Sequence, residues 1–191
     1  MSLRNRYIAA AAAAAISMMG AVSAMAASAY DFTFQGIDGK PLPLSQFRGQ
    51  TVLVVNTASQ CGFTPQYKGL EALWQRYRDR GLVVLGVPSD DFGGQEPGNA
   101  SQIKDFCEVN YSIDFPMADK TVVSGSGAHP FYRWAADELG VLAQPRWNFH
   151  KYLIGPDGRL VSWFSTITDP EAERVREAIE ELLPQPAPPK S

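Results

Sequence analysis

The stretch that most constrains the fold runs from Thr51 to Trp74, where a strand pattern, a cysteine and a helix pattern follow one another. Val52–Val55 is an apolar, β-branched run of the length typical of a fully buried strand. Small and polar residues then lead to Cys61, beyond which apolar side chains recur at three- and four-residue steps. Gly81 is placed to end the resulting helix. The pattern predicts a strand, a turn that carries a cysteine, and a helix.

Cys61 is a candidate reactive thiol. At a strand-to-helix junction, unpaired backbone N–H groups and the helix dipole favour an anion, so a thiolate is stabilised there. The alternative is a buried cysteine that acts as a small hydrophobe, which is a common use of a free cysteine. Gln60, Gly62 and Thr64 are polar or small, however, and give Cys61 no apolar shell. We therefore expect Cys61 to be reactive.

Residues 1–29 have the pattern of a secretory signal peptide. A basic start precedes the alanine-rich apolar run Ile8–Val22, and small residues follow at cleavage sites near Ala26 or Ala29. An uncleaved membrane anchor is the alternative, although the apolar run is barely long enough to supply one. We expect a bacterial export signal that is removed, and hence a periplasmic or secreted protein without stable membrane association.

The rest of the chain fits one domain over residues 30–183, followed by a disordered, proline-rich tail at 184–191. The formal net charge of -3 suggests neither nucleic acid nor an anionic membrane as a partner. Two histidines are too few and too far apart to suggest a zinc site. Neither a metal nor a cofactor is therefore expected.

The only two cysteines are Cys61 and Cys107. In an oxidising compartment such a pair is most simply a structural disulfide, for which the chain-entropy model gives about 4 kcal/mol at this loop length. Cys107 lies on a predicted helix that ends near Asn110, on the same face as Ile103 and Phe106. There it could equally be a packed apolar side chain. Both interpretations stay open on the pattern alone.

The remaining elements predict an α/β fold with a mixed sheet. Residues 30–34 and 42–44 are expected to pair as an N-terminal β-hairpin. The apolar run 82–87 follows the first helix within two residues, which makes a βαβ unit with parallel strands. Two further core strands are expected at 144–154 and 160–164, before a closing helix.

A long glycine-rich loop, Pro88–Gly98, should leave the same sheet edge from which Cys61 emerges. Gln95 and Glu96 are therefore candidates to reach the thiol, although most loops of this composition are solvated connections. Trp147 and Asn148 stand early in a predicted strand, where such residues usually pack or form turns. The closing helix is expected to begin at Asp169-Pro-Glu.

This order of elements resembles a thioredoxin-like fold, a central mixed sheet flanked by helices. Three segments are, moreover, similar to the motifs of the glutathione peroxidase family. Asn56–Thr64 resembles the peroxidatic motif, Leu85–Gly98 the second motif, and Trp147–Lys151 the third. The resemblance runs from about residue 30 to 183, and three motifs in the correct order are more specific than any one. The thioredoxin dithiol is absent because Thr64 occupies the second cysteine position.

The resemblance implies an antioxidant thiol peroxidase with the catalytic tetrad Cys61, Gln95, Trp147 and Asn148. A thiolate attacks the O–O bond of hydrogen peroxide or an organic hydroperoxide, and the indole and amide N–H groups can stabilise both the sulfur anion and the leaving oxyanion. The product at sulfur is a sulfenic acid, which has to be reduced before it is oxidised further.

The resemblance also implies a role for Cys107 as the resolving cysteine, which condenses with the sulfenic acid on Cys61. Its helix would have to loosen for this, since a disulfide requires Cα atoms within about 7 Å. A thioredoxin-type protein, or else glutathione, would then reduce the disulfide. No long insertion of the kind that builds a tetramer contact is present between Ser124 and Trp147, which favours a monomer.

Two other interpretations remain for comparison. One is a redox relay that senses peroxide and passes its oxidation to another protein. The other is a non-catalytic thioredoxin-fold domain held by a permanent disulfide.

Overall fold

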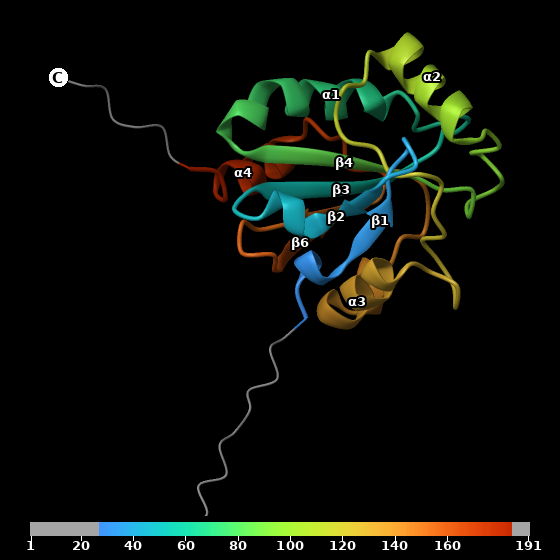
Figure 1. Ribbon diagram of the computed structural model, residues 1–191. Helices are drawn as coiled ribbons and strands as arrows, with labels where there is room; N and C mark the ends of the chain where they lie inside the picture. Colours follow the sequence, from blue (N-terminus) through green and yellow to red (C-terminus); the bar gives the residue numbers. More distant parts are fainter. Residues whose placement is uncertain (1–26, 185–191) are drawn as a thin grey trace, which may run out of the picture.

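The computed structural model describes residues 27–184, in which a four-stranded sheet lies between two layers (Figure 1). In spatial order the strands are β4 (Leu82–Pro88), β3 (Thr51–Thr57), β5 (Lys151–Ile154) and β6 (Leu160–Phe164). β3 pairs with β4 in parallel and with β5 antiparallel, and β5 pairs antiparallel with β6. The expected mixed sheet and its parallel βαβ unit are therefore confirmed.

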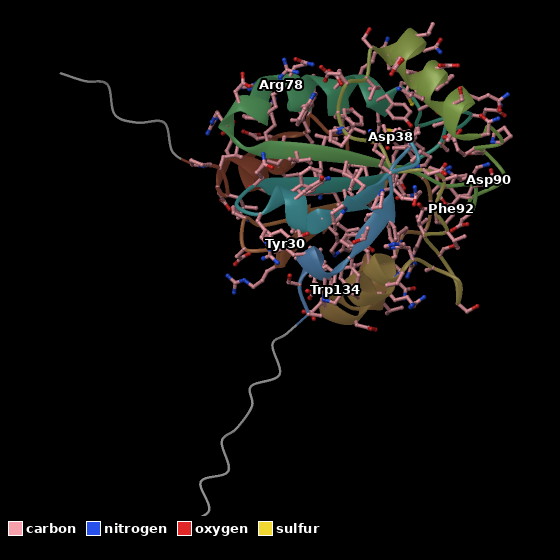
Figure 2. All side chains as sticks on the ribbon, viewed as in Figure 1. Tyr30, Asp38, Arg78, Asp90, Phe92 and Trp134 are labelled. Carbon is pink, nitrogen blue, oxygen red and sulfur yellow. The ribbon has the colours of Figure 1, made fainter. Side chains whose placement is uncertain are left out.

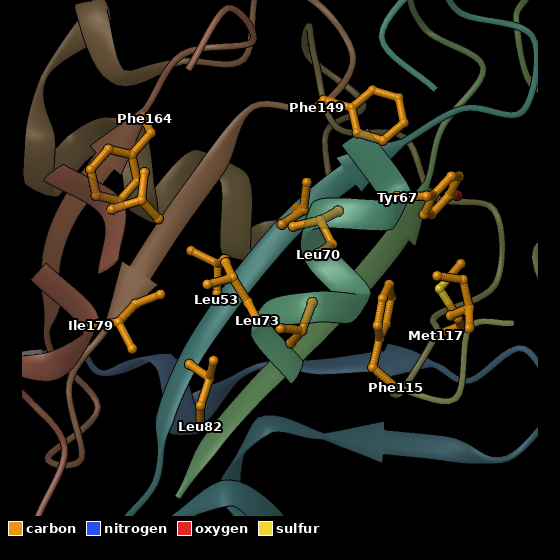
Figure 3. Packing of buried hydrophobic residues seen from close by; sticks show 14 of the residues in the cluster. Leu53, Tyr67, Leu70, Leu73, Leu82, Phe115, Met117, Phe149, Phe164 and Ile179 are labelled. Atoms are coloured by element: carbon orange, nitrogen blue, oxygen red, sulfur yellow. The ribbon is translucent and has the colours of Figure 1, made fainter. Parts of the chain in front are cut away.

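The buried strand β3 divides the core between two faces because successive side chains of a strand point in opposite directions. All seven of its residues are buried. Leu53 and Val55 face the layer that contains α1 (Gln66–Tyr77) and α4 (Glu173–Glu180), whose packing Figure 3 shows. Val52 and Val54 face the layer that contains α3 (Pro130–Leu139) and the N-terminal hairpin. Burial on both faces explains the continuous apolar run of the sequence.

The N-terminal hairpin is present but shorter than predicted. β1 (Thr33–Gln35) pairs antiparallel with β2 (Pro41–Pro43). Residues Ala29–Asp31 form a 3-10 turn, η1, and not the beginning of a strand, because Ser28 and Asp31 cap that turn reciprocally. Leu44 likewise begins the 3-10 turn η2 (Leu44–Phe47) and does not extend the return strand.

Two later boundaries also differ from the predictions. The strand expected from residue 144 begins at Lys151, because Phe149 adopts a left-handed conformation with φ of 64°, which ends an extended chain. The last helix begins at Glu173, since the Asp169 carboxylate accepts a hydrogen bond from the Glu171 N–H at 2.8 Å and forms a turn first.

The helix with Cys107, α2 (Ala100–Tyr111), lies beyond the N-terminal end of α1 (Figure 1). Asn99 caps it in a reciprocal arrangement with Gln102. Short 3-10 turns, η3 (Arg78–Arg80) and η4 (Val141–Ala143), follow α1 and α3. Gly81 ends η3 in the left-handed region, as the sequence predicts, with φ of 96°.

Residues 1–26 and 185–191 lie outside the described part of the chain, and so do most of the expected signal peptide and all but the first residue of the expected tail. Within residues 27–184, no helix combines the length and apolar character needed to cross a membrane. Over the same residues, the histidine, cysteine and carboxylate side chains form no group of three that could hold a metal ion.

Candidate active site

Cys61 lies in the turn between β3 and α1, and the residue is 7% exposed. It belongs to the hydrophobic cluster under α1, so it has apolar neighbours that the adjacent residues in the sequence did not indicate. α1 begins only at Gln66, so Cys61 precedes the helix and is not part of its first turn. The Phe63 N–H nevertheless donates a hydrogen bond to the Cys61 sulfur at 3.4 Å. The helix thus begins farther from Cys61 than the sequence suggested, and a local backbone donor contacts the sulfur directly.

Thr64 fixes this turn from the position at which a thioredoxin dithiol has its second cysteine. Its Oγ1 accepts a hydrogen bond from the Cys61 N–H at 3.0 Å and donates one to the Ala58 carbonyl at 2.9 Å. Thr64 is buried, so these bonds are shielded from water. The side chain therefore locks the backbone on both sides of the cysteine.

Gln95 and Asn148 meet at the end of the sheet where β3 and β4 finish. The Asn148 Nδ2 donates a hydrogen bond to the Gln95 Oε1 at 3.0 Å, and Asn148 is fully buried. The Gln60 N–H donates to the Gln95 carbonyl at 3.0 Å, which joins the Gln95 loop to the turn of Cys61. Because the Gln95 oxygen is directed at Asn148, the Gln95 N–H groups point elsewhere and are available as donors.

Trp147 lies over the same loop and is 39% exposed. Its ring packs against Phe92, with the ring centroids 6.0 Å apart. A Cβ added to Gly93 would lie 3.7 Å from Gln95 and 3.8 Å from Trp147, so these two side chains meet above that glycine. The structure therefore brings Gln95, Trp147 and Asn148 together and ties them to the Cys61 turn.

The loop that carries Gln95 is anchored by its own acidic residues. Figure 2 places Asp90 and Phe92 of this loop at the opposite end of the molecule from Arg78. Asp90 accepts from the Glu96 N–H at 2.8 Å, and Asp91 accepts from the Val123 N–H at 2.7 Å. The loop is thus an ordered part of the site and not a solvated connection.

Glu96, which the sequence suggested could reach the thiol, is hydrogen-bonded to Ser59 through its carboxylate. The side chain is almost fully buried, and this burial raises the pKa of the Glu96 carboxyl. Lys120 donates from its ammonium to the Glu96 carbonyl at 2.9 Å. Glu96 therefore ties its loop to the residues just before Cys61.

Asn56, at the end of β3, positions the segment that carries Trp147 and Asn148. Its Nδ2 donates to the Trp147 carbonyl at 3.1 Å, and its Oδ1 accepts from the His150 N–H at 3.1 Å. Its backbone adds two more bonds to the same segment, to Phe149 at 2.6 Å and to His150 at 3.2 Å. Sequence reasoning assigned Asn56 no role, although an amide in a fully buried strand is an indication of such a role.

Lys151 is a second residue whose role the sequence did not reveal. Its ammonium is fully buried and donates to the Gln66 side chain at 2.7 Å, the Phe149 carbonyl at 2.7 Å and the Thr168 carbonyl at 2.9 Å. Burial lowers the pKa of Lys151 to about 7. Lys151 thus connects the start of α1, the Trp147–Phe149 segment and the loop before α4.

Cys107 is buried on α2 in the same hydrophobic cluster as Cys61, and both cysteines are free thiols. The structure therefore contains no permanent disulfide of the kind that the sequence left open. Burial raises the pKa of the Cys107 thiol to about 11. The Tyr67 hydroxyl lies beside this thiol without an aligned hydrogen bond to it.

Comparison with known proteins relates this chain to a family and to individual members of it. The family model for glutathione peroxidase matches residues 29–136. The chain is 46% identical over 144 residues to a glutathione peroxidase-like peroxiredoxin of Schizosaccharomyces pombe, covering 74% of this chain and 91% of the relative. It is 43% identical over 162 residues to a hydroperoxy fatty acid reductase of Synechocystis, covering 81% of this chain and 95% of the relative.

A solved structure described as Trgpx in apo form aligns with a TM-score of 0.67 and 37% identity, over 85% of this chain and 100% of that one. Solved thioredoxin-family proteins share the same arrangement of sheet and helices, so the fold is thioredoxin-like. The family model covers more than half of the chain, and the relatives match over nearly their whole length. On both grounds the chain belongs to the glutathione peroxidase family.

Proposed function

We propose that this protein reduces hydrogen peroxide and organic hydroperoxides through Cys61, with Gln95, Trp147 and Asn148 as its catalytic partners. Family membership makes the chain an oxidoreductase that acts on peroxides. The observation that supports the residue assignment best is the hydrogen bond between Asn148 and Gln95, in a loop that is itself bonded to the Cys61 turn. These groups come from three separate segments of the chain and meet at one end of the sheet.

The proposed reaction uses neutral donors throughout. The Cys61 thiolate attacks the nearer peroxide oxygen, a sulfur–oxygen bond forms, and the O–O bond breaks. Its electron pair leaves on the distal oxygen, which takes up a proton and departs as water or an alcohol. The Phe63 N–H contacts the sulfur, and the amide groups of Gln95 and Asn148 are suited to stabilising the negative charge as it moves to oxygen. Cys61 is left as a sulfenic acid.

Re-reduction is proposed to proceed through Cys107 and a thioredoxin-type protein, with glutathione as the alternative reductant, on a monomeric enzyme. The position of Cys107 supports this step because α2 packs on the core through one face only. Ile103 and Cys107 are the only residues of its twelve that are fully buried, with Phe106 and Tyr111 partly buried against the same cluster. Release of this one helix is local unfolding, which would free Cys107 to form a disulfide with Cys61.

Cys107→Ser should lower steady-state peroxide consumption with a thioredoxin system by about tenfold or more, because the sulfenic acid on Cys61 loses its intramolecular partner. The sulfenic acid should still form and should be labelled by dimedone in larger amounts than in the wild type. Mass spectrometry after peroxide treatment measures the label and the Cys61–Cys107 disulfide together. Unchanged turnover of the variant would exclude Cys107 as the resolving residue. If the wild-type protein forms the Cys61–Cys107 disulfide but shows no turnover with the thioredoxin system, a redox relay is favoured.

We also propose that the protein is exported and that the mature chain begins at Ala27. The contacts of the first described residues support cleavage before Ala27 and not after Ala29. The Ala29 N–H donates to the Gly158 carbonyl at 2.9 Å, and Ser28 caps η1. Cleavage after Ala29 would remove both interactions.

Expression of the full chain in a bacterium should therefore yield a periplasmic protein whose intact mass corresponds to a first residue of Ala27. N-terminal sequencing of the periplasmic fraction checks the same point. A mature chain that begins at Tyr30, or a full-length chain in the membrane fraction, would contradict this proposal.

A further inference from the structure

An apolar groove of about 420 Å³ lies beside Trp147. This volume is within the range of roughly 300–1,000 Å³ that is typical of small-molecule sites. The groove runs between η4 and the end of β6, and it is lined mainly by Leu142, Trp147, His150, Trp163, Thr166 and Ile167. Through Trp147 the groove adjoins the candidate active site.

Ile167 connects the groove to the other side of Cys61. It is 80% exposed and also lines a neighbouring hollow together with Gly62 and Phe63, the two residues that follow Cys61. The groove is therefore bounded at one point by Trp147 and at another by a residue that reaches the cysteine turn. The groove therefore adjoins the turn that carries Cys61.

The buried part of the groove carries no charge, and the one charged residue that lines the groove, Arg146, is exposed to solvent. His150 is buried there and stacks on Trp163, with ring centroids 5.3 Å apart and an angle of 14° between the planes. Burial lowers the pKa of His150 to about 4, so the ring is neutral at physiological pH. Leu142 and Ile167 project from the rim into solvent, where exposed apolar side chains of this size indicate a binding surface.

We propose that this groove binds the unbranched apolar chain of an organic hydroperoxide and directs its –OOH group to Cys61. The inference rests on the proposed peroxidase function and specifies its substrate class. A concave site of this volume suits a single chain, whereas a stable protein partner buries roughly 800 Å² on each side. Each methylene placed in the groove leaves water, which favours longer chains.

The test measures the oxidation of the reduced enzyme alone, with no reductant present, so that reductant docking makes no contribution. Reduced protein is mixed with hydrogen peroxide or with butyl, octyl or dodecyl hydroperoxide below its micelle concentration. The reaction is quenched with acid, and oxidised Cys61 is counted by mass spectrometry. The second-order rate constant should rise by about tenfold or more from butyl to dodecyl hydroperoxide.

Two matched pairs of variants locate the effect. Ile167→Glu and Leu142→Glu should each lower the rate constant for dodecyl hydroperoxide by about tenfold and leave that for hydrogen peroxide within about twofold, because a carboxylate in the groove opposes an apolar chain. Each variant has a control at an apolar residue of similar exposure. Val109, which is 81% exposed, is matched to Ile167 at 80%, and Val141 at 65% is matched to Leu142 at 67%, so the controls are Val109→Glu and Val141→Glu. Neither control residue lines the groove, and both should behave as wild type.

Each other outcome is also decisive. No dependence on chain length in the wild type, or equal losses for hydrogen peroxide and dodecyl hydroperoxide in the variants, would overturn the proposed groove. A separate assay follows re-reduction of the oxidised variants by thioredoxin, and a defect confined to that assay would assign the surface to the reductant instead. Absence of Cys61 oxidation by every peroxide would refute the peroxidase function itself, which is a separate result.

Discussion

Cys61→Ser should abolish peroxide reduction, with kcat/KM falling by at least about a thousandfold for every hydroperoxide tested. A serine hydroxyl stays protonated at neutral pH and is a much weaker nucleophile than a thiolate. The hydrogen bonds that shape the turn use the backbone of residue 61 and the Thr64 side chain, so the variant keeps them. The loss should therefore be chemical and should leave the fold intact.

Peroxide consumption with a thioredoxin system measures this loss, and thermal unfolding provides the control. The melting temperature of Cys61→Ser should stay close to that of the wild type, since one small buried atom replaces another. Residual activity above the peroxide blank would place the nucleophile elsewhere, and Cys107 is the only other thiol in the chain. A large fall in melting temperature would mean instead that the packing of Cys61 is needed for stability.

The parts of the fold that follow from local patterns were predictable. The run Val52–Val55 is a buried strand, and helix α1 ends at Gly81 through η3, because burial on both faces and helical periodicity are written into neighbouring residues. The predicted beginnings of β5 and α4 were wrong by several residues. Both are decided by single turn conformations, at Phe149 and at Asp169, which a pattern of apolar residues does not reveal.

The candidate site was likewise predictable only in part. Cys61 stood out from its own neighbours, and Gln95 was a candidate from the position of its loop at the sheet edge. The catalytic roles of Gln95, Trp147 and Asn148 were identified only through the resemblance of their motifs. The supporting contacts of Asn56 were not predicted, because its two side-chain bonds reach backbone groups 91 and 94 residues away. Lys151 was overlooked for a similar reason, since its ammonium joins three separate segments. Only the folded chain brings such partners together.

Asn56→Leu tests whether this supporting contact matters. The variant should lower the free energy of unfolding by about 2–4 kcal/mol, because a side chain of similar size leaves the Trp147 carbonyl and the His150 N–H without their partner. In addition to this loss of stability, peroxidase kcat/KM should fall by about a hundredfold, since a shift of about 1 Å in the Trp147–Asn148 segment misplaces its donors. Urea unfolding and peroxide consumption measure the two effects on the same sample.

Thr57→Val is the matched control on the same strand. Thr57 is fully buried next to Asn56, but its hydroxyl has no aligned hydrogen-bond partner, so its removal should leave stability unchanged or slightly raised. The rate of Cys61 oxidation by peroxide then shows whether Asn56 positions the catalytic segment or only stabilises the fold. If Asn56→Leu loses activity only in proportion to the unfolded fraction, its role is structural. If folded Asn56→Leu still forms the sulfenic acid a hundredfold more slowly, the amide acts on catalysis by holding Trp147 and Asn148 against the Cys61 turn.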